Sequence, residues 1–233
     1  KLNRIVVNCG LPGISRESWR PMARTTAAHS TVTFNETSSC GFVESRLIKR
    51  WMHGMPIVGG PRNVTVNRDD EGGATVLRVA HDGYVKDFGI LHQRALMLSA
   101  DGRRLDGEEL FTATRGEAAL AGRDQFAVRF HLHPAIKANR LTDSHGVMLL
   151  LPNRDVWTFN AYEDRVDLEE SVYLAGAEGP RRVTVDELVD VFRMPFFVER
   201  LERTRFAHRL SARGSVAWLA SICHVGRPIS SNV

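Results

Sequence analysis

Histidines on strand-like segments are the residues of this sequence best suited to chemistry. His29 stands in the stretch TTAAHSTVTFN, residues 25–35, where Val32 and Phe34 alternate with polar residues. An imidazole in such a place can bind a metal, act as a catalytic base, or simply be a polar residue of a strand. The local sequence leaves these three interpretations open.

Two further histidines share one face of a single predicted strand. In FAVRFHLH, residues 126–133, His131 and His133 alternate with apolar residues that face the other way. Two histidines at this spacing can chelate a metal. The same alternation is typical of a strand with one solvated or cleft-lining face. Because no third ligand is evident, a stand-alone metalloenzyme built on this pair has little support.

His92 and Arg94 form the third candidate pair, on one face of ILHQRALMLS, residues 90–99. Arginine grips a carboxylate through two parallel hydrogen bonds, and a histidine can donate beside it. We therefore treat the pair as a candidate for binding the carboxylate of a substrate. The alternative is a cross-strand polar ladder that serves only the fold. The sequence has no GxSxG, HExxH, P-loop or paired CxxC motif, so spacing alone assembles no active site.

The segments that must position these residues are short and strand-like. Period-two alternation recurs through residues 1–182, and RNVTVN and ATVLRVA flank RDDEGG, which is typical of a hairpin. Many short strands with almost no helical periodicity predict an all-β fold, an antiparallel β-sandwich over residues 1–182.

The spacing of apolar residues changes near residue 183. Leu188, Phe192 and Phe196 recur at helical spacing, and Pro195 interrupts the run. We therefore expect a separate tail over residues 183–233, helical at first and then loop.

Composition narrows the functional classes. The chain has 233 residues with a net charge of +4, and its basic residues form no run with interleaved aromatics, so nucleic acid is not indicated as a partner. No apolar run approaches the roughly 18 residues of a membrane span. Cys9, Cys40 and Cys223 are too few and too widely spaced for a disulfide framework or a zinc ribbon, and we expect partly buried free thiols. The sequence begins at Lys1 and runs at once into a strand, without a signal-peptide pattern; we expect the C-terminal part of a longer protein, and targeting cannot be read.

The order of several motifs resembles a known family, the heparinase II/III-like proteins, in their C-terminal region. The similarity covers roughly residues 4–182. It is carried, in this order, by RIVVNCG, WRPMARTTAAHSTVTFN, HDGYVKDFGILHQRALMLSADGRRLDGEELF, FAVRFHLHP, LPNRDVWTFNA and LEESVYLA.

The resemblance implies a function. In this family an N-terminal α/α toroid precedes the β-sandwich, and the cleft between them cleaves acidic polysaccharides by β-elimination at a uronic acid. A base removes the C5 proton and an acid protonates the leaving oxygen. The family's catalytic residues fall upstream of Lys1, so the resemblance implies a lyase fragment that is inactive without its toroid. It also implies an acidic polysaccharide as substrate, and the periplasm or cell envelope as location. The alternative is a non-catalytic carbohydrate-binding or scaffolding sandwich.

The resemblance also bears on His29. AHSTV is similar to an Ala-His-Asn-Thr-Val motif whose histidine binds zinc in some members, and NCG occupies an Asp-x-Gly position, with Asn8 where the ligand aspartate would be. An amide oxygen is a poorer zinc ligand than a carboxylate. Two expectations follow: His29 and Asn8 contribute to a zinc site, or His29 hydrogen-bonds to Asn8 and shapes the floor of the cleft. The matching Gly-Tyr…His-x-Arg stretch, with Tyr84, His92 and Arg94, corresponds to sandwich framework.

Overall fold

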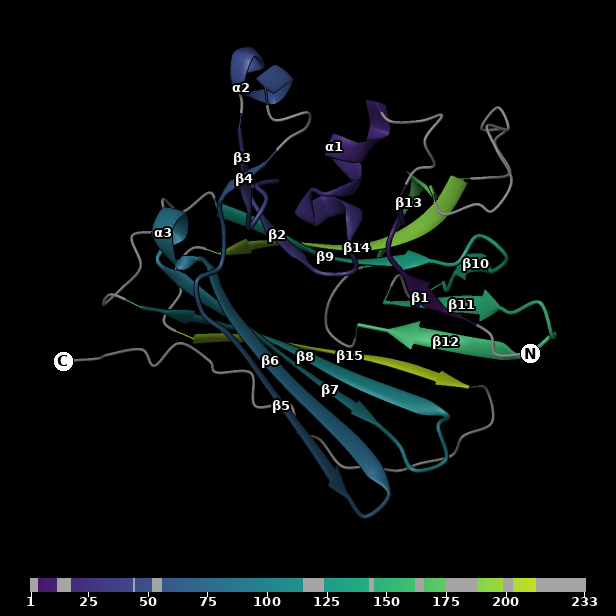
Figure 1. Ribbon diagram of the computed structural model, residues 1–233. Coiled ribbons are helices and arrows are strands. Elements are labelled where there is room, and N and C mark those ends of the chain that lie inside the picture. Colours follow the sequence, from purple (N-terminus) through teal and green to yellow (C-terminus); the bar gives the residue numbers. More distant parts are fainter. Residues whose placement is uncertain are drawn as a thin grey trace.

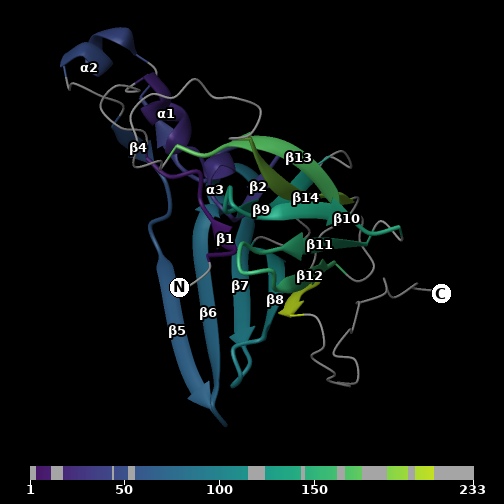
Figure 2. The same cartoon turned by 90° about the vertical axis from the view of Figure 1, so that its right-hand side faces the viewer.

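A computed structural model describes residues 4–11, 18–43, 45–51, 56–114, 124–142, 145–161, 166–174, 188–198 and 203–212. Two antiparallel sheets face each other across an apolar core (Figures 1 and 2). The predicted all-β sandwich is therefore confirmed. None of the helices in the described residues is long and apolar enough to cross a membrane.

The smaller sheet has the order β1-β9-β14-β13, and β2 pairs with β9 as well. Its strands are β1 (Val6–Val7), β2 (Val32–Phe34), β9 (Asp124–Leu132), β13 (Asp167–Val172) and β14 (Leu188–Val198). β2 and β1 follow each other along one edge of β9, opposite residues 126–128 and 131–132 respectively. The N-terminal segments that carry Asn8 and His29 are thereby held against the same strand.

The larger sheet has eight strands in the order β10-β11-β12-β15-β8-β7-β6-β5. They are β10 (Lys137–Arg140), β11 (Gly146–Leu150), β12 (Val156–Asn160), β15 (Arg203–Ala212), β8 (Arg104–Ala113), β7 (Ile90–Leu98), β6 (Ala74–Tyr84) and β5 (Val64–Glu71). The predicted hairpin of β5 and β6 turns at Gly72 and Gly73, whose φ angles of +57° and +83° favour glycine.

Short elements connect and extend the sheets. A two-stranded ladder pairs β3 (Gly41–Phe42) with β4 (Ile57–Gly59). The helices are α1 (Arg20–Ala23), a 3-10 turn η2 (Thr26–Ala28), α2 (Arg46–Trp51) and α3 (Val85–Phe88).

Aromatic side chains fill the space between the two sheets. Phe34, Phe111 and Phe126 are almost fully buried, and the rings of Phe34 and Phe111 meet edge to face with centroids 5.1 Å apart. Tyr84 lies in the same cluster and donates a hydrogen bond to the carbonyl of Val32 at 2.7 Å. This bond ties the end of β6 to β2, and thus one sheet to the other.

The prediction of a helical tail is wrong for the described residues. β14 lies between β13 and β9, and β15 lies between β12 and β8, so both strands belong to the sandwich rather than to a tail after residue 182. Pro195 is tolerated because β13 pairs only with residues 188–193 of β14, so Pro195 has a neighbouring strand on one side only. The rest of the predicted tail, residues 183–187, 199–202 and 213–233, lies outside the described residues.

The cysteines agree with the sequence-based expectation. Cys9 and Cys40 are free thiols, and burial raises the pKa of Cys9. Cys223 lies outside the described residues.

Candidate functional site

A buried polar cluster crosses three neighbouring strands of the larger sheet. Glu109 on β8 is 1% exposed and accepts hydrogen bonds from two side chains of β7: from His92 Nε2 at 2.7 Å and from Arg94 Nε at 2.6 Å. His92 Nδ1 lies 3.0 Å from Nε2 of His81 on β6. The strand register places these residues opposite one another, because His81 pairs with His92 and Arg94 pairs with Glu109.

The hydrogen bonds of this cluster form a chain in which each group donates to the next, from Gly83 through His81 and His92 to Glu109. The backbone N–H of Gly83 donates to Nδ1 of His81 at 3.2 Å, so His81 carries its proton on Nε2 and donates it to His92. His92 then donates to Glu109. Burial, with the neighbouring His92, lowers the pKa of His81 to about 4, and the ring stays neutral at pH 7.

Arg94 connects this cluster to the segment that carries His29. Its Nη1 donates to the carbonyl of Ser30 at 2.7 Å, while its guanidinium lies over the ring of Phe130, 5.7 Å from the centroid. Nη2 is buried and has no hydrogen-bond partner within the described residues. The positive charge of the guanidinium is stabilised there by a cation–π contact with Phe130. Arg94 is therefore a buried cation that fixes the backbone next to His29.

Ser30 anchors the same loop to the smaller sheet. Its hydroxyl donates to the carbonyl of Val7 and accepts from the backbone N–H of His131 at 2.9 Å. Its own N–H donates to Oδ1 of Asn8 at 2.9 Å. One small side chain thus joins β1, β9 and the loop, and this leaves little freedom for the adjacent His29.

His29 is half-buried, and its orientation is set by one hydrogen bond. Nδ1 lies 2.8 Å from the carbonyl of Thr25, so Nδ1 carries the proton and Nε2 is the free lone pair. Within the described residues Nε2 has no hydrogen-bond partner. A histidine held in this way through Nδ1 has the tautomer that metal-binding histidines use, and it equally suits acceptance of a proton or a hydrogen bond.

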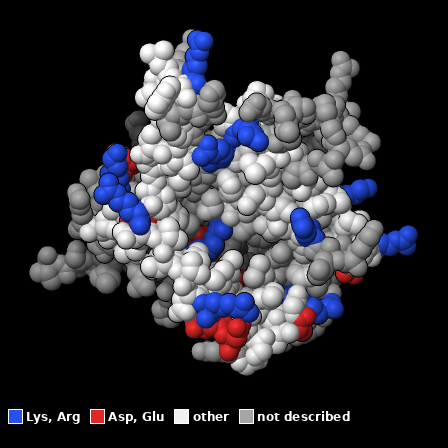
Figure 3. Space-filling model, in the orientation of Figure 1, with Lys and Arg blue, Asp and Glu red and all other residues white. Residues whose placement is uncertain are grey.

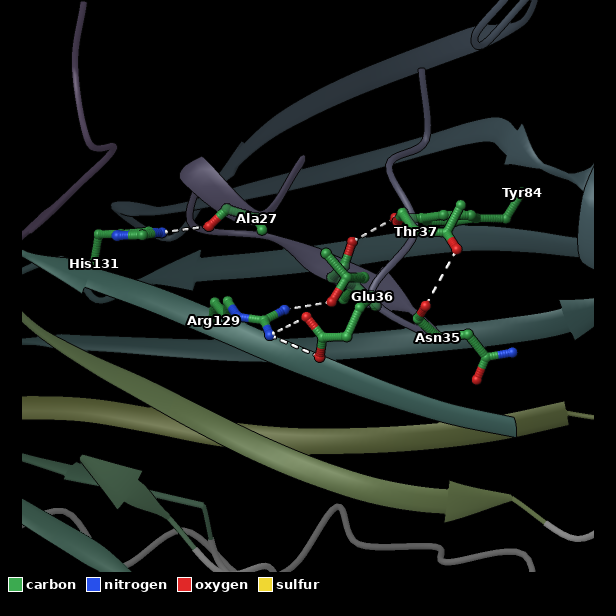
Figure 4. A network of polar contacts seen from close by, with 9 residues as sticks. Ala27, Asn35, Glu36, Thr37, Tyr84, Arg129 and His131 are labelled. Atoms are coloured by element: carbon green, nitrogen blue, oxygen red, sulfur yellow. Dashed lines mark hydrogen bonds and ion pairs between the residues drawn. The ribbon is translucent and has the colours of Figure 1, made fainter. Parts of the chain in front are cut away.

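His131 has a structural role on the same loop. Its Nε2 donates to the carbonyl of Ala27 at 2.9 Å (Figure 4). Its Nδ1 lies 3.4 Å from the hydroxyl of Ser171. It is 3% exposed, and burial lowers its pKa. His131 therefore supports the loop before His29 and does not face solvent.

A second buried arginine lies two residues earlier on β9. Arg129 grips both carboxylate oxygens of Glu36, at 2.9 and 2.7 Å, and also donates to the hydroxyl of Thr33 (Figure 4). Glu36 stands in a turn with a φ of +55°, and the ion pair holds this turn against the strand. The role of the Arg129–Glu36 pair is therefore structural.

The larger sheet also carries a groove, and Arg94 is one of its lining residues. It has a volume of about 370 Å³ over β5–β8, and Asn67, Arg78, Gln93 and Glu108 are among its polar lining residues. Arg78 already pairs with Asp69 at 2.8 Å, and His29 and Asn8 do not line this groove. We therefore place the candidate site at the His29 loop.

The structure brings some of the predicted residues together and separates others. Asn8 and His29 lie on neighbouring segments, but the Asn8 side chain bonds to the backbone of Ser30, in place of the expected bond to His29. His92 and Arg94 do hold a carboxylate, but it is that of Glu109, which matches the cross-strand ladder. His131 and His133 have separate partners: His131 bonds to the carbonyl of Ala27, whereas Nδ1 of His133 accepts from the N–H of Ala135.

The donor set is a poor fit to zinc on its own. No group of three or more His, Cys, Asp or Glu side chains that could hold a metal occurs in the described residues. A structural or catalytic zinc takes at least three protein ligands, whereas this loop offers one imidazole and one amide oxygen already bonded to an N–H. The residues present supply at most part of such a site.

Two functional residues were missed by the sequence reasoning. Glu109 is the centre of the buried cluster, and Ser30 ties the loop to two strands. Glu109 carried a readable signal: the Asp101–Gly102 turn sets the register of the two strands that flank it, and counting back from that turn places Glu109 opposite Arg94. Ser30 stands where the Ala-His-Asn-Thr-Val motif has its asparagine, but nothing in the sequence indicates its bonds to Val7 and His131.

Comparison with known proteins agrees with this architecture. Residues 1–209 match the family described as "Heparinase II/III-like, C-terminal". The chain belongs to this family. The match extends through β14 and well into β15, which agrees with their place inside the sandwich.

Relatives of this family member are larger proteins. The chain is 31% identical over 181 residues to FtsZ-localized protein C of Caulobacter vibrioides, across 72% of the chain and 28% of that protein. Its fold is similar to heparan sulfate lyase HepC of Pedobacter heparinus, with a TM-score of 0.59, 12% identity, and 89% of the chain and 28% of the lyase covered. A heparinase III gene product gives a TM-score of 0.61 at 10% identity, with the same coverage. The chain thus spans just over a quarter of the length of these proteins.

Proposed function

We propose that this chain is the β-sandwich part of a polysaccharide lyase that cleaves uronic-acid-containing glycans by β-elimination. In this proposal the sandwich forms one wall of the substrate cleft and an upstream α/α toroid forms the other. The sandwich alone is catalytically silent. Family membership supports the proposal, and so does the similarity in fold to heparan sulfate lyase. As for other members, a location in the periplasm or cell envelope is part of it.

The observation that carries the proposal is the way His29 is held. The buried Glu109–Arg94 pair fixes the carbonyl of Ser30, and Ser30 fixes two strands, so the backbone at His29 is clamped from both sheets. A framework histidine would need no such support, whereas a group that meets a substrate or a metal must be held in place. The bond from His29 to Thr25 leaves Nε2 available for that contact.

His29 does not complete a reaction centre without groups from elsewhere. β-Elimination needs a base at C5, an acid at the leaving oxygen, and neutralisation of the uronate carboxylate. His29 can accept a proton or a hydrogen bond at Nε2, and it is one group of the several required.

The test is to compare the 233-residue chain with the longer protein on a panel of uronic-acid glycans. New ultraviolet absorbance from unsaturated uronic ends is expected from the longer protein and not from the chain. Activity of the chain alone would show that the sandwich holds a complete centre, against the proposal. An upstream sequence that does not encode a toroid would also contradict it.

One observation favours a second candidate, a non-catalytic carbohydrate-binding or scaffolding sandwich. Asn8 replaces the expected aspartate, and its amide serves the backbone of Ser30. The similarity to a protein named for its localisation with FtsZ points in the same direction. The two candidates separate in the same experiment: a scaffold predicts glycan or protein binding by the longer protein, with no unsaturated product on any substrate of the panel.

A further inference from the structure

An arm projects from the sandwich at residues 41–43, 45–51 and 56–59, and it exposes apolar side chains. The arm consists of the β3–β4 ladder and α2, which connects the two strands. In Figures 1 and 2, α2 lies at the end of the molecule farthest from the larger sheet. On α2, Leu47 is 81% exposed and Trp51 is 80% exposed. Large apolar side chains that are exposed together on a protein surface often mark an interaction site.

The large apolar residues of α2 share one face. Leu47 and Trp51 are four residues apart and therefore lie on the same face of α2, with Ile48 next to them. Lys49 and Arg50 fall on the remaining arc of the helix. In the adjoining strand β4, Ile57 and Val58 are 53% and 66% exposed. The arm thus combines an outward apolar face with a basic flank.

The strands β3 and β4 of the arm are held by hydrogen bonds and a cation–π contact, whereas the apolar side chains of α2 are exposed. Gly41 pairs with Gly59, the N–H of Val43 donates to the carbonyl of Pro56 at 3.1 Å, and the guanidinium of Arg24 stacks 5.4 Å from the centroid of Phe42. The exposed face is therefore presented by a structured hairpin.

Charge complementarity indicates the kind of partner. Residues 41–59 of the sequence contain three Lys and Arg residues and one acidic residue. In Figure 3 the upper end of the molecule carries Lys and Arg, whereas the Asp and Glu in view gather mainly at the lower end. Lysine is depleted in the cores of protein–protein interfaces, whereas Trp and Leu beside Lys and Arg are typical of segments that lie in the headgroup layer of a membrane.

We propose that this arm docks the protein on an anionic lipid surface. Leu47 and Trp51 enter the boundary between headgroups and acyl chains, and Lys49 and Arg50 meet the lipid phosphates. This is peripheral binding, in keeping with the absence of a membrane-spanning helix from the described residues. The proposal goes beyond the lyase function and does not depend on it.

The test is sedimentation of the 233-residue chain with vesicles of phosphatidylcholine alone or of an equal mixture of phosphatidylcholine and phosphatidylglycerol. The chain is expected to sediment with the anionic vesicles and to be released by salt. Leu47→Gln with Trp51→Gln should lower the bound fraction at least about tenfold, and Lys49→Gln with Arg50→Gln should remove the preference for the anionic vesicles.

The matched control is Met97→Gln with Leu98→Gln, which removes two exposed apolar side chains at the far end of β7. This variant should bind as the wild type does, and circular dichroism should show that all variants are folded. The proposal is overturned if the wild type stays in the supernatant, or if the arm variant binds as well as the control. It is also overturned if the chain forms a dimer that the arm variant abolishes while no variant binds vesicles, because a second copy would then be the partner.

Discussion

Glu109 is an almost fully buried carboxylate that two side chains of the next strand approach within 2.7 Å. Removing one partner of a buried ion pair leaves the other charge without compensation. We expect Glu109→Ala to lower the free energy of unfolding by about 3–5 kcal/mol, measured by urea denaturation.

The control for Glu109 is an ion pair on the surface of the same sheet. Arg68 and Asp70 have side chains that are 64% and 58% exposed, and Asp70→Ala should lower the stability far less than Glu109→Ala does. Equal losses for the two variants would mean that the buried cluster does not have the strength we assign to it.

His81 predicts a pH dependence of stability. Folding lowers its pKa from 6.5 to about 4, so the unfolded chain binds the proton more readily than the folded one. The contribution of neutral His81 to the free energy of unfolding is complete above about pH 6.5 and is lost as the pH falls toward 4. Between pH 7 and pH 5 this amounts to at most about 2 kcal/mol.

The measurement is the free energy of unfolding of the wild type and of His81→Gln at both pH values. The variant should lose less stability than the wild type on going from pH 7 to pH 5. If the two proteins lose the same amount, the ring is not held neutral in the folded state.

At the scale of elements, Tyr84 joins the end of β6 to β2. Tyr84→Phe keeps the ring in the core and removes the hydroxyl that donates to the carbonyl of Val32. Because that hydroxyl is buried, the loss should destabilise the fold by about 1–2 kcal/mol in thermal or chemical unfolding. Tyr173→Phe, at a half-buried ring beside His133, should change stability by less than about 0.5 kcal/mol. A smaller effect at Tyr84 than at Tyr173 would contradict the role given to this bond.

Elements with clear local signals could be predicted from the sequence. The alternation in β9 correctly placed Phe126, Val128 and Phe130 in the core, and the Gly72–Gly73 turn marked the hairpin of β5 and β6. β14 could not be predicted in this way. Its apolar residues fit helical spacing and strand alternation equally well, and its partners β9 and β13 are distant in the sequence.

The candidate site was predictable only in part, for a related reason. His92 and Arg94 were placed on one face correctly, because period two is a local property. Their carboxylate partner, Glu109, depends on strand register, and the bond from Arg94 to Ser30 joins residues 64 positions apart. The burial of His131 likewise follows from a loop that packs over β9 and not from the strand itself.

At the scale of the whole molecule, the sandwich holds His29 together with a set of hydrogen bonds that keep its loop in place. The polar cluster of the larger sheet, the Ser30 bridge and the His131 contact all converge on residues 25–30. The chain covers only 28% of the lyase that it resembles in fold. The central claim is therefore that this rigid loop forms one wall of a cleft whose other wall lies outside the chain.

The most direct test of this claim is the lyase activity of the longer protein carrying His29→Ala, with His133→Ala as the matched histidine control. We predict that His29→Ala lowers the rate of formation of unsaturated uronic ends by about 10- to 100-fold, whereas His133→Ala stays within about twofold of the wild type. A His29→Ala protein as active as the wild type would contradict the account, and so would a wild-type protein that releases no unsaturated ends from any uronic-acid glycan.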